Sequence, residues 1–136
     1  MGHRTKSVKP VLVVEDSPLL ERMIIESLEK AGYVNVMCCH NGREAWDTLM
    51  KLKESGDPIS DHASIVITDI EMPQMDGHRL LRLIREDPIL RKLPVIIFSS
   101  LITNEMRAKG DELGATAQIT KQEITNLVKT IDENIL

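Results

Sequence analysis

Short apolar runs alternate with amphipathic stretches along the whole chain. The runs lie at 11–14, 34–39, 65–68, 94–98 and 117–120. They are largely continuous rather than alternating with polar residues, which is typical of strands buried on both faces of a sheet. The pattern therefore predicts five buried strands.

The stretches between these runs carry apolar residues at helical spacing. They predict helices at about 18–31, 43–52, 77–87, 104–113 and 124–135. The predicted ends agree with this reading. Ser17-Pro18 is typical of a helix cap followed by proline in the first turn, and Gly32 and Gly114 are typical of helix stops.

Strands and helices that alternate in this way favour a doubly wound α/β fold. Right-handed crossovers place the helices on both faces of a parallel five-stranded sheet. In such sheets, ligands bind beyond the carboxyl ends of the strands. The residues that follow each strand are therefore the first candidates for a functional site.

The composition excludes some classes of function. The chain has 136 residues, of which 42% are hydrophobic and 28% charged, with a net charge of −4. It has no run of Lys or Arg and only three aromatic residues, so nucleic-acid binding is not expected. No stretch approaches the ~18 apolar residues of a membrane span. We expect a cytoplasmic domain without membrane insertion.

Two local features are interpreted structurally. The polar residues 1–9 are expected to be a disordered N-terminal segment or a cloning scar, which leaves 10–136 as one domain. The neighbouring Cys38 and Cys39 would face opposite sides of a strand, so a mutual disulfide is not expected. They are interpreted as reduced packing residues.

Polar side chains follow four of the predicted strands. Glu15 and Asp16 follow the first strand, Asp69 the third, Ser99 closes the fourth, and Lys121 follows the fifth. Each residue alone is typical of a turn, a cap or a solvated surface. Together they would meet at one edge of the sheet and form one site.

Their chemistry is complementary. Converging carboxylates repel one another and need a cation, and an all-oxygen site favours Mg²⁺. Lys121 adds a positive charge and Ser99 a hydroxyl donor. Such a set can neutralise a phosphoryl group that is transferred to a carboxylate, and Asp69 is the best acceptor because it follows a central strand.

Four segments of the chain resemble the receiver domains of two-component response regulators. They read VVEDSP, ITDIEMPQMDG, PVIIFSS and GATAQITK, and the resemblance covers about 10–135. It implies a flavodoxin-like, CheY-like sheet with strand order 2-1-3-4-5. It also implies a switch that takes a phosphoryl group from a sensor histidine kinase and assists its own phosphorylation and dephosphorylation, rather than an enzyme that turns over a substrate.

The resemblance also implies a role for each site residue. Asp69 would be the phosphoacceptor. Asp16 and Asp69 would bind Mg²⁺ directly, Glu15 through water, and Glu71 through its backbone carbonyl. Pro73, Asp76 and Gly77 then shape the turn into the next helix, with Asp76 expected to be a cap. Ser99 would be the switch hydroxyl and Lys121 the lysine that senses the phosphate.

Two positions depart from the common receiver pattern. Lys121 is followed by Gln122 instead of proline, and a cis bond before a non-proline residue costs about 3 kcal/mol, so a trans bond is expected. Gln118 stands where many receivers carry an aromatic residue. It is interpreted as a flexible polar side chain, which leaves Ser99 and the segment 100–103 to transmit the signal.

The segments DIEMPQMDG and IREDPILRKLPVIIFSSL, with ITK, most resemble the receiver domains of CheV chemotaxis proteins. These proteins join a CheW-like coupling domain to a C-terminal receiver. The resemblance implies a CheA-like kinase as partner. It further implies a fused CheW-like domain in a longer protein, of which this chain would be a fragment.

Two other classes of protein stay open at this level. A phosphohydrolase of the haloacid-dehalogenase type also uses an aspartyl nucleophile with a carboxylate two residues later, as in Asp69 and Glu71. Its nucleophile usually follows the first strand, and it carries a substrate-capping domain. A scaffold that works without phosphorylation is the other alternative, although it would not need the acidic, hydroxyl and lysine positions together.

Overall fold

Five short strands form one parallel sheet in the computed structural model, which describes residues 5–136 of the chain. They are β1 (Val11–Val14), β2 (Val36–Cys39), β3 (Ile65–Thr68), β4 (Val95–Ser99) and β5 (Ala117–Thr120). Their order across the sheet is β2-β1-β3-β4-β5, and every neighbouring pair is parallel. The predicted architecture and strand order are confirmed.

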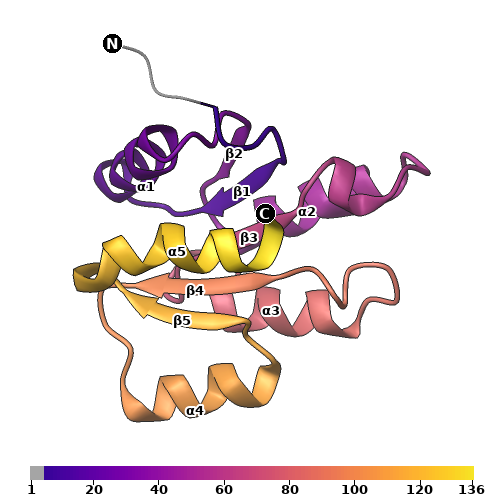
Figure 1. The fold of residues 1–136 in the computed structure, drawn as a ribbon. Helices are drawn as coiled ribbons and strands as arrows, with labels where there is room; N and C mark the ends of the chain where they lie inside the picture. Colours follow the sequence, from indigo (N-terminus) through magenta and orange to yellow (C-terminus); the bar gives the residue numbers. More distant parts are fainter. Residues whose placement is uncertain (1–4) are drawn as a thin grey trace.

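Five α-helices cover the two faces of this sheet (Figure 1). They are α1 (Pro18–Lys30), α2 (Gly42–Lys53), α3 (Gly77–Glu86), α4 (Asn104–Leu113) and α5 (Ile124–Ile135). Single turns of 3-10 helix occur at Ile59–Asp61 and Lys121–Glu123. Helices α1 and α5 share one hydrophobic core with the sheet, and α2, α3 and α4 share the other. Within the described range, none of the helices has both the length and the apolar character needed to cross a bilayer.

The central strands are apolar throughout because both of their faces are covered. Val11 and Val13 of β1 pack toward α1 and α5, whereas Leu12 and Val14 pack toward the other three helices. All four side chains are at most 1% exposed. Period-2 alternation therefore distributes the residues between two cores, instead of between a core and solvent.

Capping residues set where the helices start and stop. The Ser17 side chain accepts a hydrogen bond from the Leu20 N–H at the start of α1, and Asp76 accepts one from the Arg79 N–H at the start of α3. Gly114, with φ of 88°, ends α4 in the left-handed conformation that favours glycine. The predicted caps at Ser17 and Asp76 are confirmed.

The described part of the segment before β1 contacts the rest of the domain. Residues 1–4 lie outside the described range. The backbone N–H groups of Lys6 and Ser7 donate to the Gly32 carbonyl at 2.7 and 3.2 Å, and the Lys6 ammonium lies 2.7 Å from an Asp132 carboxylate oxygen. These contacts join residues 6 and 7 to the loop after α1 and to α5, and the expected disorder of 1–9 stays a prediction.

Tyr33, in the loop after α1, connects that loop to α5 by a hydrogen bond. Its side chain is fully buried, and its hydroxyl donates to Asp132 Oδ1 at 2.5 Å. Burial, together with the hydrogen bond and the negative charge of Asp132, raises the pKa of the Tyr33 hydroxyl above its ordinary value. The phenol therefore stays neutral and acts as a donor that fixes α5 against the end of α1.

Replacing Tyr33 with phenylalanine tests this link. Tyr33→Phe keeps the ring and removes the donor to Asp132, so the free energy of unfolding should fall by about 1–3 kcal/mol. Lys6→Ala removes the partly exposed ion pair to the same carboxylate and the contact of the ammonium with the Tyr33 ring, and it should cost about 1 kcal/mol. Urea unfolding compares them, and equal losses in both variants would contradict the assigned importance of the phenol.

Candidate functional site

The predicted site residues lie at one edge of the sheet. Since all the strands are parallel, their carboxyl ends meet there. Val14 pairs with Thr68 at the ends of β1 and β3, so Glu15 and Asp69 follow on adjacent strands. Ser99 pairs with Thr120 at the ends of β4 and β5, which brings Ser99 beside the residue before Lys121.

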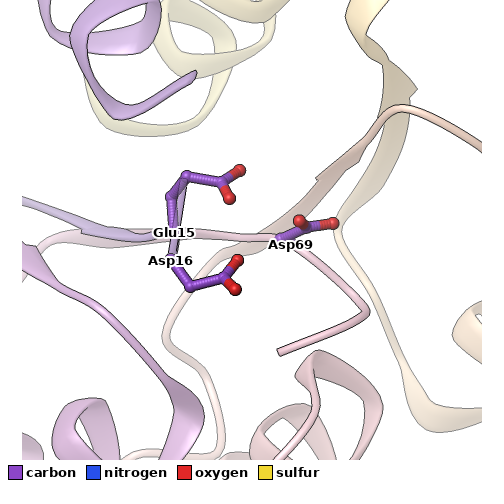
Figure 2. A group of neighbouring side chains, drawn as sticks. All are labelled: Glu15, Asp16 and Asp69. Carbon is purple, nitrogen blue, oxygen red and sulfur yellow. The ribbon is translucent and has the colours of Figure 1, made fainter. Parts of the chain in front are cut away.

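Three carboxylates form the centre of this edge. Glu15, Asp16 and Asp69 each offer an oxygen, and these three oxygens lie within 4.8 Å of one another. Figure 2 shows the three side chains, two from the end of β1 and one from the end of β3. The predicted convergence of these carboxylates is present in the structure.

The surroundings of Glu15 oppose its ionisation. It is 1% exposed, and its Oε2 accepts a hydrogen bond from the Ser17 N–H at 3.1 Å. Its Oε1 is buried and has no hydrogen-bond partner among the described residues. Burial and the negative charge of Asp69 raise the pKa of Glu15 from 4.5 to about 7. Ionised Glu15 therefore needs more positive charge than the protein alone supplies.

A divalent cation fits these donors. Hard cations such as Mg²⁺ take carboxylate, carbonyl and water oxygens and need few carboxylates. The three clustered oxygens and the unpaired Glu15 Oε1 supply that chemistry. The Glu71 carbonyl, two residues after Asp69, accepts no hydrogen bond within residues 5–136 and is free to serve as a further oxygen donor.

The Asp69 carboxylate is held in one orientation. The side chain belongs to a residue that is 9% exposed, and its Oδ1 accepts a hydrogen bond from the Ile70 N–H at 2.7 Å. Its Oδ2 has no protein partner in the described chain and is not sealed from solvent. One oxygen is thus anchored by the backbone, whereas the other is free of protein partners in the described chain.

Ser99 and Lys121 complete the edge. Ser99 is 5% exposed, and its hydroxyl makes no hydrogen bond to any residue from 5 to 136. Lys121 lies close enough for its positive charge to lower the pKa of Glu15, against the larger effects of burial and of Asp69. No peptide bond in the described range is cis, so the expected trans bond between Lys121 and Gln122 is confirmed.

The loop between β3 and α3 depends on a close backbone contact. The Gly77 N–H donates to the Ile70 carbonyl at 2.7 Å. A Cβ added at Gly77 would lie 1.9 Å from the Asp69 carbonyl oxygen. Gln74 in the same loop has φ of 63°, which is uncommon for a residue with a side chain. The sequence marks Gly77 as a turn residue, but no local signal marks Gln74.

Gln118 is held more firmly than the sequence suggests. Its Nε2 donates to the Arg107 carbonyl at 2.9 Å and to Asp111 Oδ1 at 2.8 Å, both on α4. A Cβ added at Gly110 would lie 2.3 Å from Gln118 Oε1, so the glutamine packs against the glycine. The interpretation of Gln118 as a flexible side chain is wrong, because α4 presents matching acceptors and a gap.

The chain is similar to one well-defined family. A profile of the response regulator receiver domain matches residues 11–132. Chemotaxis protein CheV3 of Helicobacter pylori is 29% identical over 132 residues, which cover 96% of this chain and 42% of CheV3. Chemotaxis protein CheY1 of the same organism is 33% identical over 90 residues, which cover 66% of each chain.

A solved structure agrees with these matches. The signal receiver domain of a signal transduction histidine kinase from Syntrophus aciditrophicus superposes with a TM-score of 0.78 at 31% identity. The superposition covers 94% of this chain and 90% of that domain. The chain therefore spans nearly all of a solved receiver domain but less than half the length of CheV3.

The contact at Gly77 generates a stability prediction. Alanine is favoured over glycine in a helix by about 1 kcal/mol, yet its Cβ would collide with the Asp69 carbonyl. We expect Gly77→Ala to lower the free energy of unfolding by about 1–3 kcal/mol. Asn104→Ala, at the exposed first residue of α4, is the matched control and should change it little. Equal effects in thermal melts would contradict the contact.

The raised pKa of Glu15 generates a pH prediction. Between its unfolded value of 4.5 and its folded value of about 7, the folded chain binds more protons than the unfolded chain. Stability without metal should therefore fall as pH rises through this window. Glu15→Gln cannot ionise and should flatten that fall in urea unfolding with EDTA present. The same slope in both proteins would show that Glu15 is not the group responsible.

Proposed function

The chain belongs to the response regulator receiver domain family, and we propose that it is a phosphorylation switch of a chemotaxis two-component system. Asp69 would receive a phosphoryl group from a phosphohistidine of a CheA-like sensor histidine kinase. The observation that carries this proposal is the Asp69 carboxylate, with Oδ1 anchored and Oδ2 open beside two further carboxylates. A structural acid at a strand end has no need of this arrangement.

The transfer follows from the position of each group. Asp69 Oδ2 attacks the phosphorus atom of the phosphohistidine and forms a new O–P bond. The N–P bond breaks, and its electron pair stays on the kinase imidazole. The Lys121 ammonium and the Ser99 hydroxyl, which has no protein partner in the described residues, donate to the phosphoryl oxygens as charge develops on them.

The same edge would hold Mg²⁺. Asp16, Asp69 and the Glu71 carbonyl are proposed as direct ligands, and Glu15 as a ligand through water, in accord with the clustered oxygens. The cation, when bound, supplies charge that offsets the carboxylates and the phosphoryl oxygens. Glu15 and Asp16 thereby hold positive charge next to the nucleophile, without taking part in bond formation.

Reversal of the modification makes the domain a switch. Water attacks the acyl phosphate of Asp69, the bond from phosphorus to the carboxylate oxygen breaks, and inorganic phosphate leaves. The carboxylate is regenerated for another round. The same groups that neutralise the phosphoryl oxygens during transfer assist this hydrolysis, so the domain promotes both steps on itself instead of turning over an external substrate.

We propose that the signal leaves through Ser99 and α4. When the Ser99 hydroxyl turns toward the phosphate, the segment 100–103 that follows it would move as well. Leu101 in this segment is 63% exposed, so the movement would change the surface of the domain. That segment leads directly into α4, and side-chain hydrogen bonds from Gln118 of β5 hold α4 against the strand. Movement at the start of α4 would therefore act against the Gln118 hydrogen bonds and change the surface formed by α4 and β5.

The wider setting follows from the relatives. Similarity to CheV3 supports a chemotaxis role. A fused CheW-like domain is proposed from the resemblance to CheV proteins alone. Similarity to CheY1 supports the same pathway class, and we place the domain in the cytoplasm, where such kinases present phosphohistidine. The match of the receiver profile to residues 11–132 disfavours the haloacid-dehalogenase alternative.

Phosphorylation at Asp69 is tested directly by mass. Acetyl phosphate with Mg²⁺ should add one phosphoryl group to the intact wild-type chain, and the bond should be labile as an acyl phosphate is. Asp69→Asn should add none, whereas Asp47→Asn, which changes an exposed acid on α2, should react like wild type. Stoichiometric labelling of Asp69→Asn would refute the assignment of the acceptor. Failure of the wild-type chain to label would favour a phosphorylation-independent scaffold.

The metal site makes a separate prediction. A ligand that binds only the folded chain stabilises it, by about 2.7 kcal/mol at ~100 times its dissociation constant. Mg²⁺ should therefore raise the melting temperature of the wild-type chain, and much less that of Asp16→Asn. Asp47→Asn serves again as the control and should respond like wild type. Equal shifts in all three proteins would place the metal elsewhere.

A further inference from the structure

Thr68 is the last residue of β3 and the only polar residue in that strand. It is completely buried, and in the register of the sheet it lies beside Val14 of β1 and Ile97 of β4. Both neighbours belong to the hydrophobic core that the sheet shares with α2, α3 and α4. A hydroxyl in such surroundings is costly unless it forms a hydrogen bond. Valine has the same branched shape without that cost, so the presence of the hydroxyl is informative.

The Thr68 hydroxyl has one hydrogen-bond partner among residues 5–136. It donates to the backbone carbonyl of Asp69 at 2.9 Å. No backbone N–H of the described chain donates to this carbonyl, because the ladder between β1 and β3 ends with the Asp69 N–H, which donates to Val14 at 3.1 Å. The carbonyl also lies against Gly77, where an added Cβ would be 1.9 Å away. Within the described range, the hydroxyl is therefore the donor that satisfies a closely packed carbonyl.

The peptide group that contains this carbonyl also orients the Asp69 side chain. The Asp69 carbonyl and the Ile70 N–H belong to one planar unit, which turns as a whole. The Thr68 hydroxyl holds the carbonyl end, and the Ile70 N–H at the other end donates to Asp69 Oδ1 at 2.7 Å. Hydrogen bonds linked in a chain of this kind polarise and strengthen one another. The hydroxyl is thus connected, through a single peptide group, to the anchored carboxylate oxygen.

We propose that Thr68 is a positioning residue for the phosphoacceptor. By fixing the peptide between Asp69 and Ile70, it keeps Oδ1 anchored and thereby holds Oδ2 in one place for attack on phosphorus. A transfer loses rate when the attacking atom is less well placed. This inference rests on the proposed function of Asp69, whereas its geometric part, the effect of Thr68 on the Ile70 hydrogen bond, is independent of that function.

Two variants separate the hydroxyl of Thr68 from its methyl group. Thr68→Val keeps the shape and removes the donor, so it should slow labelling by acetyl phosphate at saturating Mg²⁺ by about twofold to tenfold. Thr68→Ser keeps the donor and loses a buried methyl group. It should label within about twofold of the wild-type rate even though its melting temperature falls. Intact mass, followed over time, measures each rate.

Ser64→Ala is the matched control. The Ser64 hydroxyl is also buried and also donates to a backbone carbonyl, that of Pro10, at 2.6 Å. Ser64 precedes β3 and therefore lies at the end of the strand opposite Asp69. Ser64→Ala should lower the melting temperature and leave the labelling rate unchanged. If Thr68→Val does not fold, Thr68→Cys, which has a much weaker donor, carries the same expectations.

The Ile70 amide reports the geometry without any phosphorylation. The full chain is labelled with ¹⁵N and kept free of metal with EDTA. Thr68→Val should shift the Ile70 amide proton upfield and speed its exchange with solvent, because its hydrogen bond to Asp69 Oδ1 is weakened. Thr68→Ser and Ser64→Ala should leave this proton near its wild-type position.

Three results would overturn the proposal. The first is an Ile70 amide that is unchanged in Thr68→Val, because the peptide would then not depend on the hydroxyl. The second is a wild-type labelling rate in Thr68→Val. The third is equal slowing in Thr68→Val and Ser64→Ala, because the rate would then follow stability alone. Failure of the wild-type chain to label would instead refute the proposed function, and the Ile70 amide would still decide whether Thr68 holds the peptide.

Discussion

The repulsion of three carboxylates at the ends of two adjacent strands is the constraint on which the functional edge depends. The parallel register of β1 and β3 places Glu15, Asp16 and Asp69 together whatever their charges. Burial of the apolar strands holds that register, so the sheet stabilises an arrangement that electrostatics disfavours. The raised pKa of Glu15 is the direct consequence. A site that binds a cation and accepts a phosphoryl group makes use of the same excess of negative charge.

Two close contacts link the carboxylate edge of the sheet to the neighbouring helices α3 and α4. Gly77 allows α3 to begin against the Asp69 carbonyl, so Asp69 and the helix are positioned by one backbone contact. On the other side, Gln118 packs against Gly110 and bonds to α4. On the β3 side, the site is therefore held by a backbone contact that leaves no room for a side chain at Gly77. On the β4–β5 side, α4 is held by the Gln118 hydrogen bonds, which are polar contacts that the proposed movement of α4 would have to break.

The sequence predicts the strands, helices and acidic edge well, because these depend on local patterns. The apolar run Val11–Val14 is enough by itself to predict a buried strand. Asp69 is identified as a site residue because it directly follows another such run. The remaining features depend on contacts between distant segments. The pairing of Gln118, for example, requires a gap at Gly110 and hydrogen-bond acceptors on α4. The raised pKa of Glu15 requires knowledge of its burial, which no local pattern reports.

A crystal structure of the chain with Mg²⁺ and beryllofluoride, which mimics a phosphoryl group, tests the central claim most directly. The account predicts the beryllium atom bonded to Asp69 Oδ2, with Lys121 and Ser99 contacting its fluorines. It also predicts Mg²⁺ beside Asp16, Asp69 and the Glu71 carbonyl. Beryllofluoride bound at another residue, or a cation held away from these oxygens, would contradict the account.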